Sequence, residues 1–234
     1  MTAKPAAHRT HRDLGDKLSH ALAPLKPKLR GWLHAGTFPL ATAAGIVLIC
    51  LAPTTPARWA AAIYTAASML LFGISALYHR FYWSPTGEAL LRRLDHSNIF
   101  LLIAGTYTPF SIVLLNGTDR ILLLATVWGG ALIGVLFRVF WVGAPRWLYT
   151  PIYLALGWVA IFWMRDFYHL GGAAVVTLLV VGGGLYSLGA IVYGLKRPDP
   201  SPRWFGFHEI FHACTVAAFV SHYVAISLVT YTSA

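Results

Sequence analysis

Apolar residues along this chain gather into seven long runs separated by short polar connections. Most of the runs approach or exceed the roughly 20 residues that an α-helix needs to cross the hydrocarbon core of a membrane. None of them shows the alternation of apolar and polar residues that marks a strand of a membrane β-barrel. The pattern therefore predicts an all-α protein, a seven-transmembrane helix bundle. We place its spans at residues 36–53, 59–81, 95–115, 120–141, 147–165, 171–195 and 206–231.

The composition agrees with a membrane protein. The 234 residues are 57% hydrophobic and only 11% charged, whereas soluble domains are about 25% charged. Cys50 and Cys214 lie within apolar runs, which favours small packing residues over a disulfide framework or a cysteine-based zinc site. The first apolar run follows a long basic stretch, so a cleavable secretory signal is not expected.

Residues 1–35 form a basic, polar lead before the first apolar run. Leucines recur there every three or four residues from Leu14 to Leu33, which is the helical period. Pro24 and Pro27 interrupt that period and disfavour one straight helix. Two interpretations stay open: a short amphipathic helix lying on anionic lipid, or a plain cytosolic tail.

The distribution of lysine and arginine predicts the orientation of the bundle. With the N-terminus inside the cell, only Arg58, Arg120 and Arg165 of the 18 basic residues fall on the outer side. Because basic residues collect in cytosolic loops, we expect a cytosolic N-terminus and a C-terminus outside. The net charge of +10 then marks the cytosolic face of a membrane protein, and no nucleic-acid partner is expected.

Ionisable residues inside membrane spans are costly and usually functional, and here they gather at the predicted cytosolic boundary. His79 ends the second segment, Asp95 begins the third, and His208 and His212 begin the seventh. The two histidines of the seventh segment stand four residues apart and therefore share one face of a helix. Ser75 lies one turn deeper than His79 on the same face.

Three histidines and a carboxylate are the groups that a catalytic zinc site needs. Three neutral imidazoles leave a fourth position on Zn²⁺ for a water molecule, which the ion activates. We predict His79, His208 and His212 as zinc ligands. Asp95 would orient the water and take its proton. Ser75 would donate a hydrogen bond within the site or to a substrate carbonyl.

Other polar residues near this set have competing interpretations. Residues 208–212 fit the H-E-x-x-H pattern of zinc metalloproteases, in which Glu209 would be the general base and Asp95 a third ligand. His96 lies about 100° around the helix from Asp95 and is a weaker candidate. His222 lies about 15 Å beyond His212 along a helix, so it cannot share the same ion and has a packing or second-site role. No partner is identifiable for the remaining histidines, which we expect to be solvated or interfacial: His8, His11, His20, His34 and His169.

Small residues predict two places where helices approach closely. Gly130 and Gly134 form a small-xxx-small pair suited to helix packing. The glycine run at 182–184 allows either a close approach or a kink.

The region 36–231 resembles the haemolysin III family, the bacterial branch of the progestin and adipoQ receptor family. Three motifs carry the resemblance, and their order and placement on helices make it specific. They are Ser75-x-x-x-His79, then Asp95-x-x-x-Ile99 followed by LLIAGTYTP at 101–109, and His208-x-x-x-His212 with His222 after it.

This resemblance implies seven transmembrane helices, a cytosolic N-terminus and a multi-pass protein of the bacterial inner membrane. It also implies a zinc ion near the cytosolic face, held by the three histidines, with Asp95 and Ser75 in the roles given above. It argues against Glu209 as the base, since relatives place other residue types between the two histidines of the last motif. The wider group resembles alkaline ceramidases and is proposed to contain metal-dependent amide or ester hydrolases.

We therefore expect a zinc-dependent hydrolase of lipid amide or ester bonds that contributes to membrane-lipid homeostasis, with membrane lipids as partners and substrate. A first alternative is a lipid sensor or regulator without enzymatic activity, in which zinc ties the helices together. A second alternative is a pore-forming haemolysin. The almost wholly apolar middle of the predicted spans disfavours the pore, because pores usually need a continuous polar lining.

Overall fold

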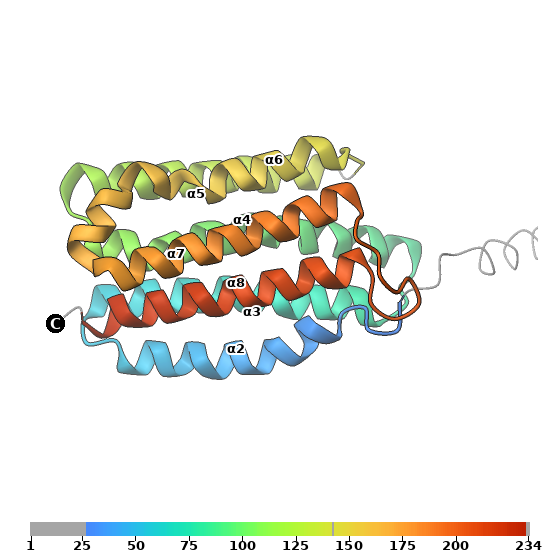
Figure 1. Ribbon diagram of the computed structural model, residues 1–234, viewed down its shortest axis with the longest axis horizontal. Helices are drawn as coiled ribbons and strands as arrows, with labels where there is room; N and C mark the ends of the chain where they lie inside the picture. Colours follow the sequence, from blue (N-terminus) through green and yellow to red (C-terminus); the bar gives the residue numbers. More distant parts are fainter. Residues whose placement is uncertain (1–26, 142, 233–234) are drawn as a thin grey trace, which may run out of the picture.

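The computed structural model describes residues 27–141 and 143–232, and within them the chain forms seven α-helices, one short 3₁₀ helix and no β-strand (Figure 1). The predicted all-α class and seven-helix bundle are confirmed. The helices are α2 (Trp32–Leu51), α3 (Thr55–Arg80), α4 (Pro85–Leu114), α5 (Gly117–Phe140), α6 (Arg146–Gly157), the 3₁₀ helix η1 (Val159–Trp163), α7 (Met164–Leu195) and α8 (Phe207–Tyr231).

Successive helices run back and forth along one elongated bundle (Figure 1). Helices α2 to α5 pack each against the next, α7 packs along α8, and α8 closes the arrangement against α2 and α4. Helix α4 occupies the middle, since 72% of its most apolar stretch is buried against 22% for α2 and for α5. The core of the bundle therefore surrounds α4, with the flanks of α2 and α5 left for lipid.

Side-chain caps set the starts of α3 and α4. The Thr54 hydroxyl accepts a hydrogen bond from the Ala57 amide at 3.3 Å, and the Ser84 hydroxyl accepts one from the Gly87 amide at 3.2 Å. A proline follows each cap at the first or second helical position, where its missing N–H is harmless. Helix α4 consequently begins at Pro85, ten residues before the predicted apolar span, because a cap can start a helix outside the hydrocarbon. Asp95 therefore lies almost three turns inside α4.

Six stretches are long and apolar enough to cross a membrane in the described part of the chain, and one of them, Arg146–Leu195, is 50 residues long and contains α6, η1 and α7. The chain reverses direction between α6 and α7 (Figure 1). Within α7, Gly172 breaks the helical geometry with φ 84° and ψ 171°, a conformation that glycine adopts without strain. The α-helical part of the predicted span 147–165 ends earlier, at Gly157, and η1 continues it.

The glycine pairs do accommodate close packing. A Cβ atom at Gly130 would lie 2.7 Å from Leu156 of α6, and one at Gly134 would overlap the ring of Phe100 on α4. A Cβ at Gly182 would overlap the ring of His222 on α8. The glycine run at 182–184 thus permits a close approach of α7 and α8, while the kink lies at Gly172.

The basic connections collect at one end of the bundle. The described chain begins at that end, together with the loops after α3, α5 and α7, and its last residues lie at the other end (Figure 1). The segment before α2 belongs to the same end, since the Lys28 and Leu29 amides donate to the carbonyls of Arg203 and Trp204. Residues 1–26, which hold most of the predicted tail, lie outside the described residues. The assignment of the basic end to the cytosol stays a prediction.

Candidate metal centre

Three histidines from two helices converge at the basic end of the bundle. His79 comes from the last turn of α3, and His208 and His212 come from the first turns of α8. One nitrogen of each ring lies within 4.8 Å of the others, and the Nε2 atoms of His79 and His208 are 3.3 Å apart. That separation fits two nitrogens bound to one tetrahedral zinc ion at roughly 2.0–2.1 Å. The rings of His79 and His212 are buried, so water does not compete strongly for their lone pairs.

The beginning of α8 fixes both of its histidines. The Glu209 carboxylate accepts a hydrogen bond from the Gly206 amide at 2.8 Å, one residue before the helix starts, which satisfies a donor that a helix end otherwise leaves unpaired. His208 and His212 are then one turn apart, with their ring centroids 4.6 Å from each other. Helix α8 thus presents two imidazoles toward the end of α3.

Asp95 and Ser75 join the histidine cluster. The Asp95 Oδ2 atom lies 3.6 Å from His79 Nε2 and 3.9 Å from His96 Nδ1. The Ser75 hydroxyl, one turn before His79 on α3, is a side-chain hydrogen-bond partner of the same carboxylate. All five residues singled out in the sequence therefore meet at one place, drawn from α3, α4 and α8.

A fourth histidine lies against the cluster, and the expectation that it is solvated or interfacial is wrong. His34 of α2 is 3% exposed and stacks on His212 with ring centroids 3.8 Å apart and planes at 14°. Neither of its ring nitrogens has a hydrogen-bond partner among the described residues. Because the predicted first span began at residue 36, His34 was left in the tail, whereas α2 begins at Trp32. The hydrophobic pattern carried no signal of this contact, because the contact depends on where α2 starts.

The other histidines take separate roles. His96 donates a hydrogen bond from Nδ1 to the Arg92 carbonyl at 2.7 Å. His222 lies 3.2 Å from the Leu179 carbonyl through Nε2 and stays outside the metal-binding group. His169 is exposed, whereas His8, His11 and His20 are outside the described residues.

Glu209 is turned away from the histidines. Its Oε1 atom pairs with the Arg30 guanidinium, and its Oε2 atom holds the start of α8. Its side chain is 1% exposed. This arrangement disagrees with the protease interpretation of residues 208–212, because both carboxylate oxygens already have partners in the fold.

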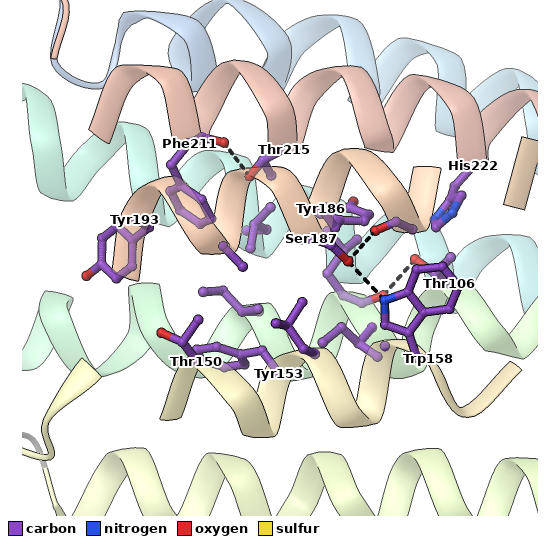
Figure 2. Close-up of a pocket in the computed structure, with 18 of the residues that line it drawn as sticks. Thr106, Thr150, Tyr153, Trp158, Tyr186, Ser187, Tyr193, Phe211, Thr215 and His222 are labelled. Carbon is purple, nitrogen blue, oxygen red and sulfur yellow. Dashed lines mark hydrogen bonds between the residues drawn. The ribbon is translucent and has the colours of Figure 1, made fainter. Parts of the chain in front are cut away.

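An apolar chamber opens from the histidine cluster into the bundle. It has a volume of about 140 Å³, and Ser75, Asp95, His208 and His212 form part of its wall. Figure 2 shows Tyr193 and Thr150 at one end of this chamber and Trp158 and His222 at the other. Most of the wall consists of apolar side chains from α4, α6, α7 and α8. The arrangement brings imidazoles and a carboxylate beside a space suited to a hydrocarbon chain.

Comparison with known proteins identifies the family. A family model described as haemolysin-III related matches residues 22–223. The chain belongs to this family. It is 39% identical over 146 residues to the hemolysin-3 homolog of Bacillus subtilis (strain 168), covering 62% of this chain and 68% of that protein.

Two further relatives extend the comparison. The hemolysin-3 of Bacillus cereus is 39% identical over 140 residues, which is 60% of this chain and 64% of that protein. The adiponectin receptor protein of Drosophila melanogaster is 28% identical over 160 residues, covering 59% of this chain and only 35% of the receptor. The predicted family is confirmed, and with it a multi-pass bacterial membrane protein that is distantly related to adiponectin receptors.

Proposed function

We propose that the protein is a zinc-dependent hydrolase of lipid amide or ester bonds that contributes to membrane-lipid homeostasis. One observation carries this proposal: the nitrogens of His79, His208 and His212 lie within 4.8 Å of one another, and two of these histidines, His208 and His212, line an apolar chamber. A donor set of three imidazoles suits zinc, and it leaves one coordination position unfilled by protein. A purely structural zinc site usually has four protein ligands.

His79, His208 and His212 would hold the ion, which would supply a Lewis acid and an activated water. The Asp95 carboxylate, 3.6 Å from His79 Nε2, is placed to accept a proton at Oδ2 from an attacking water and to return it to the leaving group. Ser75 would hold this carboxylate in position through its hydroxyl. The chamber would take the acyl chain and keep bulk water from the reacting bond.

The proposal is tested with purified protein and a panel of acyl lipids, comparing wild type with Asp95→Asn. We expect the asparagine variant to keep its zinc and to lose at least about a hundredfold in turnover, the usual contribution of a general base. Asp119→Asn is the matched control, since Asp119 is an exposed acid at the other end of the bundle. Unchanged turnover in Asp95→Asn would remove the proposed mechanism.

Two alternatives predict different results in the same assay. A zinc-stabilised lipid sensor would lose thermal stability when the metal is removed but would hydrolyse none of the lipids. A pore, suggested by the word hemolysin in the names of the Bacillus relatives, would pass ions after reconstitution. The mostly apolar wall of the chamber favours a lipid chain over a column of water as its content.

A further inference from the structure

A second, strongly basic cavity borders the histidine cluster, and His79 and His208 form part of its wall. It has a volume of about 730 Å³, and none of the described residues that line it is an aspartate or glutamate. We call it the basic vestibule and define it by its five cationic residues: Arg30, Arg92, Arg138, Arg146 and Lys196. A cavity lined by charges of one sign concentrates ions of the opposite sign, so the vestibule is a place where an anion would collect.

Arg138 indicates that the vestibule is a specific binding site. It lies in the last turn of α5 and is 2% exposed. Its Nε and Nη1 atoms are buried without a hydrogen-bond partner in the described part of the chain. Its guanidinium lies over the ring of Tyr149, 4.5 Å from the centroid. A buried cation without a paired anion is strongly unfavourable, which indicates that an anion other than the described side chains completes the site.

Arg146 provides a second fixed cation in the vestibule. Its guanidinium lies 4.4 Å from the ring centroid of Tyr193, and its Nη1 donates to the Tyr193 carbonyl at 3.4 Å. Arg30 differs from it, because Glu209 already neutralises that guanidinium. Arg92 and Lys196 are exposed and add to the potential without a fixed geometry. Two guanidinium groups held in position by aromatic rings lose little freedom when they bind a ligand.

The vestibule and the apolar chamber meet at the candidate metal centre. His96, Tyr149, Tyr193 and His208 contribute to the walls of both cavities. A molecule that reaches across this boundary would place a charged group among the arginines and a hydrocarbon chain inside the bundle.

We propose that the basic vestibule binds a phosphate group, with Arg138 and Arg146 as its principal ligands. Planar guanidinium groups match the oxygens of phosphate and bind them through paired hydrogen bonds. The phosphate could belong to a lipid headgroup or to a soluble phosphate ion. If it belongs to a lipid, the bond to be hydrolysed lies between the phosphate and the acyl chain, so the substrate is a phosphate-bearing acyl lipid. Only the assignment of this phosphate-bearing lipid as a substrate rests on the proposed function.

The test uses the full chain, purified in a neutral detergent and stripped of metal with a chelator. Native mass spectrometry measures the binding of each probe to it. The probes are phosphatidic acid, a diacylglycerol with the same acyl chains, and inorganic phosphate. We expect phosphatidic acid to bind at least about tenfold more tightly than diacylglycerol, and Arg138→Gln to weaken it about tenfold, as the loss of a charged hydrogen bond does. Displacement of the lipid by millimolar phosphate would support a lipid headgroup as the ligand, and displacement at micromolar phosphate would support a soluble ion.

Arg203→Gln is the matched control, because Arg203 is an exposed cation at the same end of the bundle but outside the vestibule. We expect it to change binding by less than about twofold, as surface charges usually do. If Arg138→Gln does not fold, Arg146→Gln carries the test, since Arg146 is only half-buried.

Equal binding of phosphatidic acid and diacylglycerol, or wild-type binding in the vestibule variants, would overturn the proposal. Because the protein is metal-free in this experiment, binding without turnover supports the vestibule even if the hydrolase proposal fails. Turnover of phosphate-free lipids by a protein that does not bind phosphate would support the hydrolase proposal and overturn the vestibule proposal.

Discussion

Buried Glu209 and partly buried Arg30 form an ion pair that fastens the start of α8 to the segment before α2. The same carboxylate accepts the Gly206 amide. In the stretch 208–212, the two histidines thus face the candidate metal centre, while the glutamate between them faces the fold. The pattern H-E-x-x-H describes spacing only, and it is the partners of Glu209 that distinguish a structural acid from a catalytic base.

Replacing Glu209 is therefore expected to affect stability and not metal binding. Glu209→Ala leaves the Arg30 guanidinium partly buried and unpaired, which should lower the free energy of unfolding by roughly 3 kcal/mol. Thermal denaturation in detergent measures this, and metal analysis should still find zinc. Glu88→Ala is the control, since Glu88 is exposed in the first turn of α4. Lost turnover with unchanged stability would instead make Glu209 the base.

The three ligand candidates make a direct prediction about metal content. His79→Ala and His212→Ala should each reduce bound zinc from about one ion per chain to a small fraction, because two remaining imidazoles hold zinc poorly. Metal analysis of monodisperse protein measures the change. His169→Ala, at an exposed position on α7, should keep the full content. Wild-type zinc in both cluster variants would show that the ion, if present, lies elsewhere.

His34 allows packing to be separated from coordination. It stacks on His212, but its nitrogens are not part of the group of three that lies within 4.8 Å. We expect His34→Phe to keep zinc, because a phenyl ring preserves the stacked contact. His34→Ala should weaken zinc binding by about tenfold through lost support of His212, in the range seen when residues around a metal ligand are removed. A zinc-free His34→Phe protein would assign His34 as a ligand.

Much of this site was predictable from the sequence because membrane spans contain so few polar residues. His79, Asp95 and His208 were noticeable as ionisable groups near the ends of apolar runs. The distribution of lysine and arginine predicted that these ends lie on the same side of the membrane. The stack of His34 on His212 was not predictable, since it depends on α2 starting four residues before its apolar run. The role of Glu209 depended on Arg30, 179 positions away in the chain, and no local pattern encodes that contact.

Gly182 and Gly184 give a matched pair of tests for the α7–α8 contact. A Cβ at Gly182 would overlap the ring of His222, whereas one at Gly184 meets nothing within 4 Å. Gly182→Ala should lower the free energy of unfolding by about 1–3 kcal/mol through overpacking. Gly184→Ala should leave stability unchanged or raise it slightly, because alanine favours the helix. Thermal denaturation of both variants measures their stabilities. Equal stabilities would contradict the close approach of α7 and α8.

The division of the candidate ligands between α3 and α8 has a consequence for biosynthesis. His79 enters the membrane early, whereas His208 and His212 follow every other described helix in chain order. A nascent chain therefore has no complete donor set until α8 has been inserted and has docked beside α3. Metal loading would then occur only on fully assembled molecules, and a chain stalled before α8 would leave the ribosome with an isolated imidazole that zinc binds weakly.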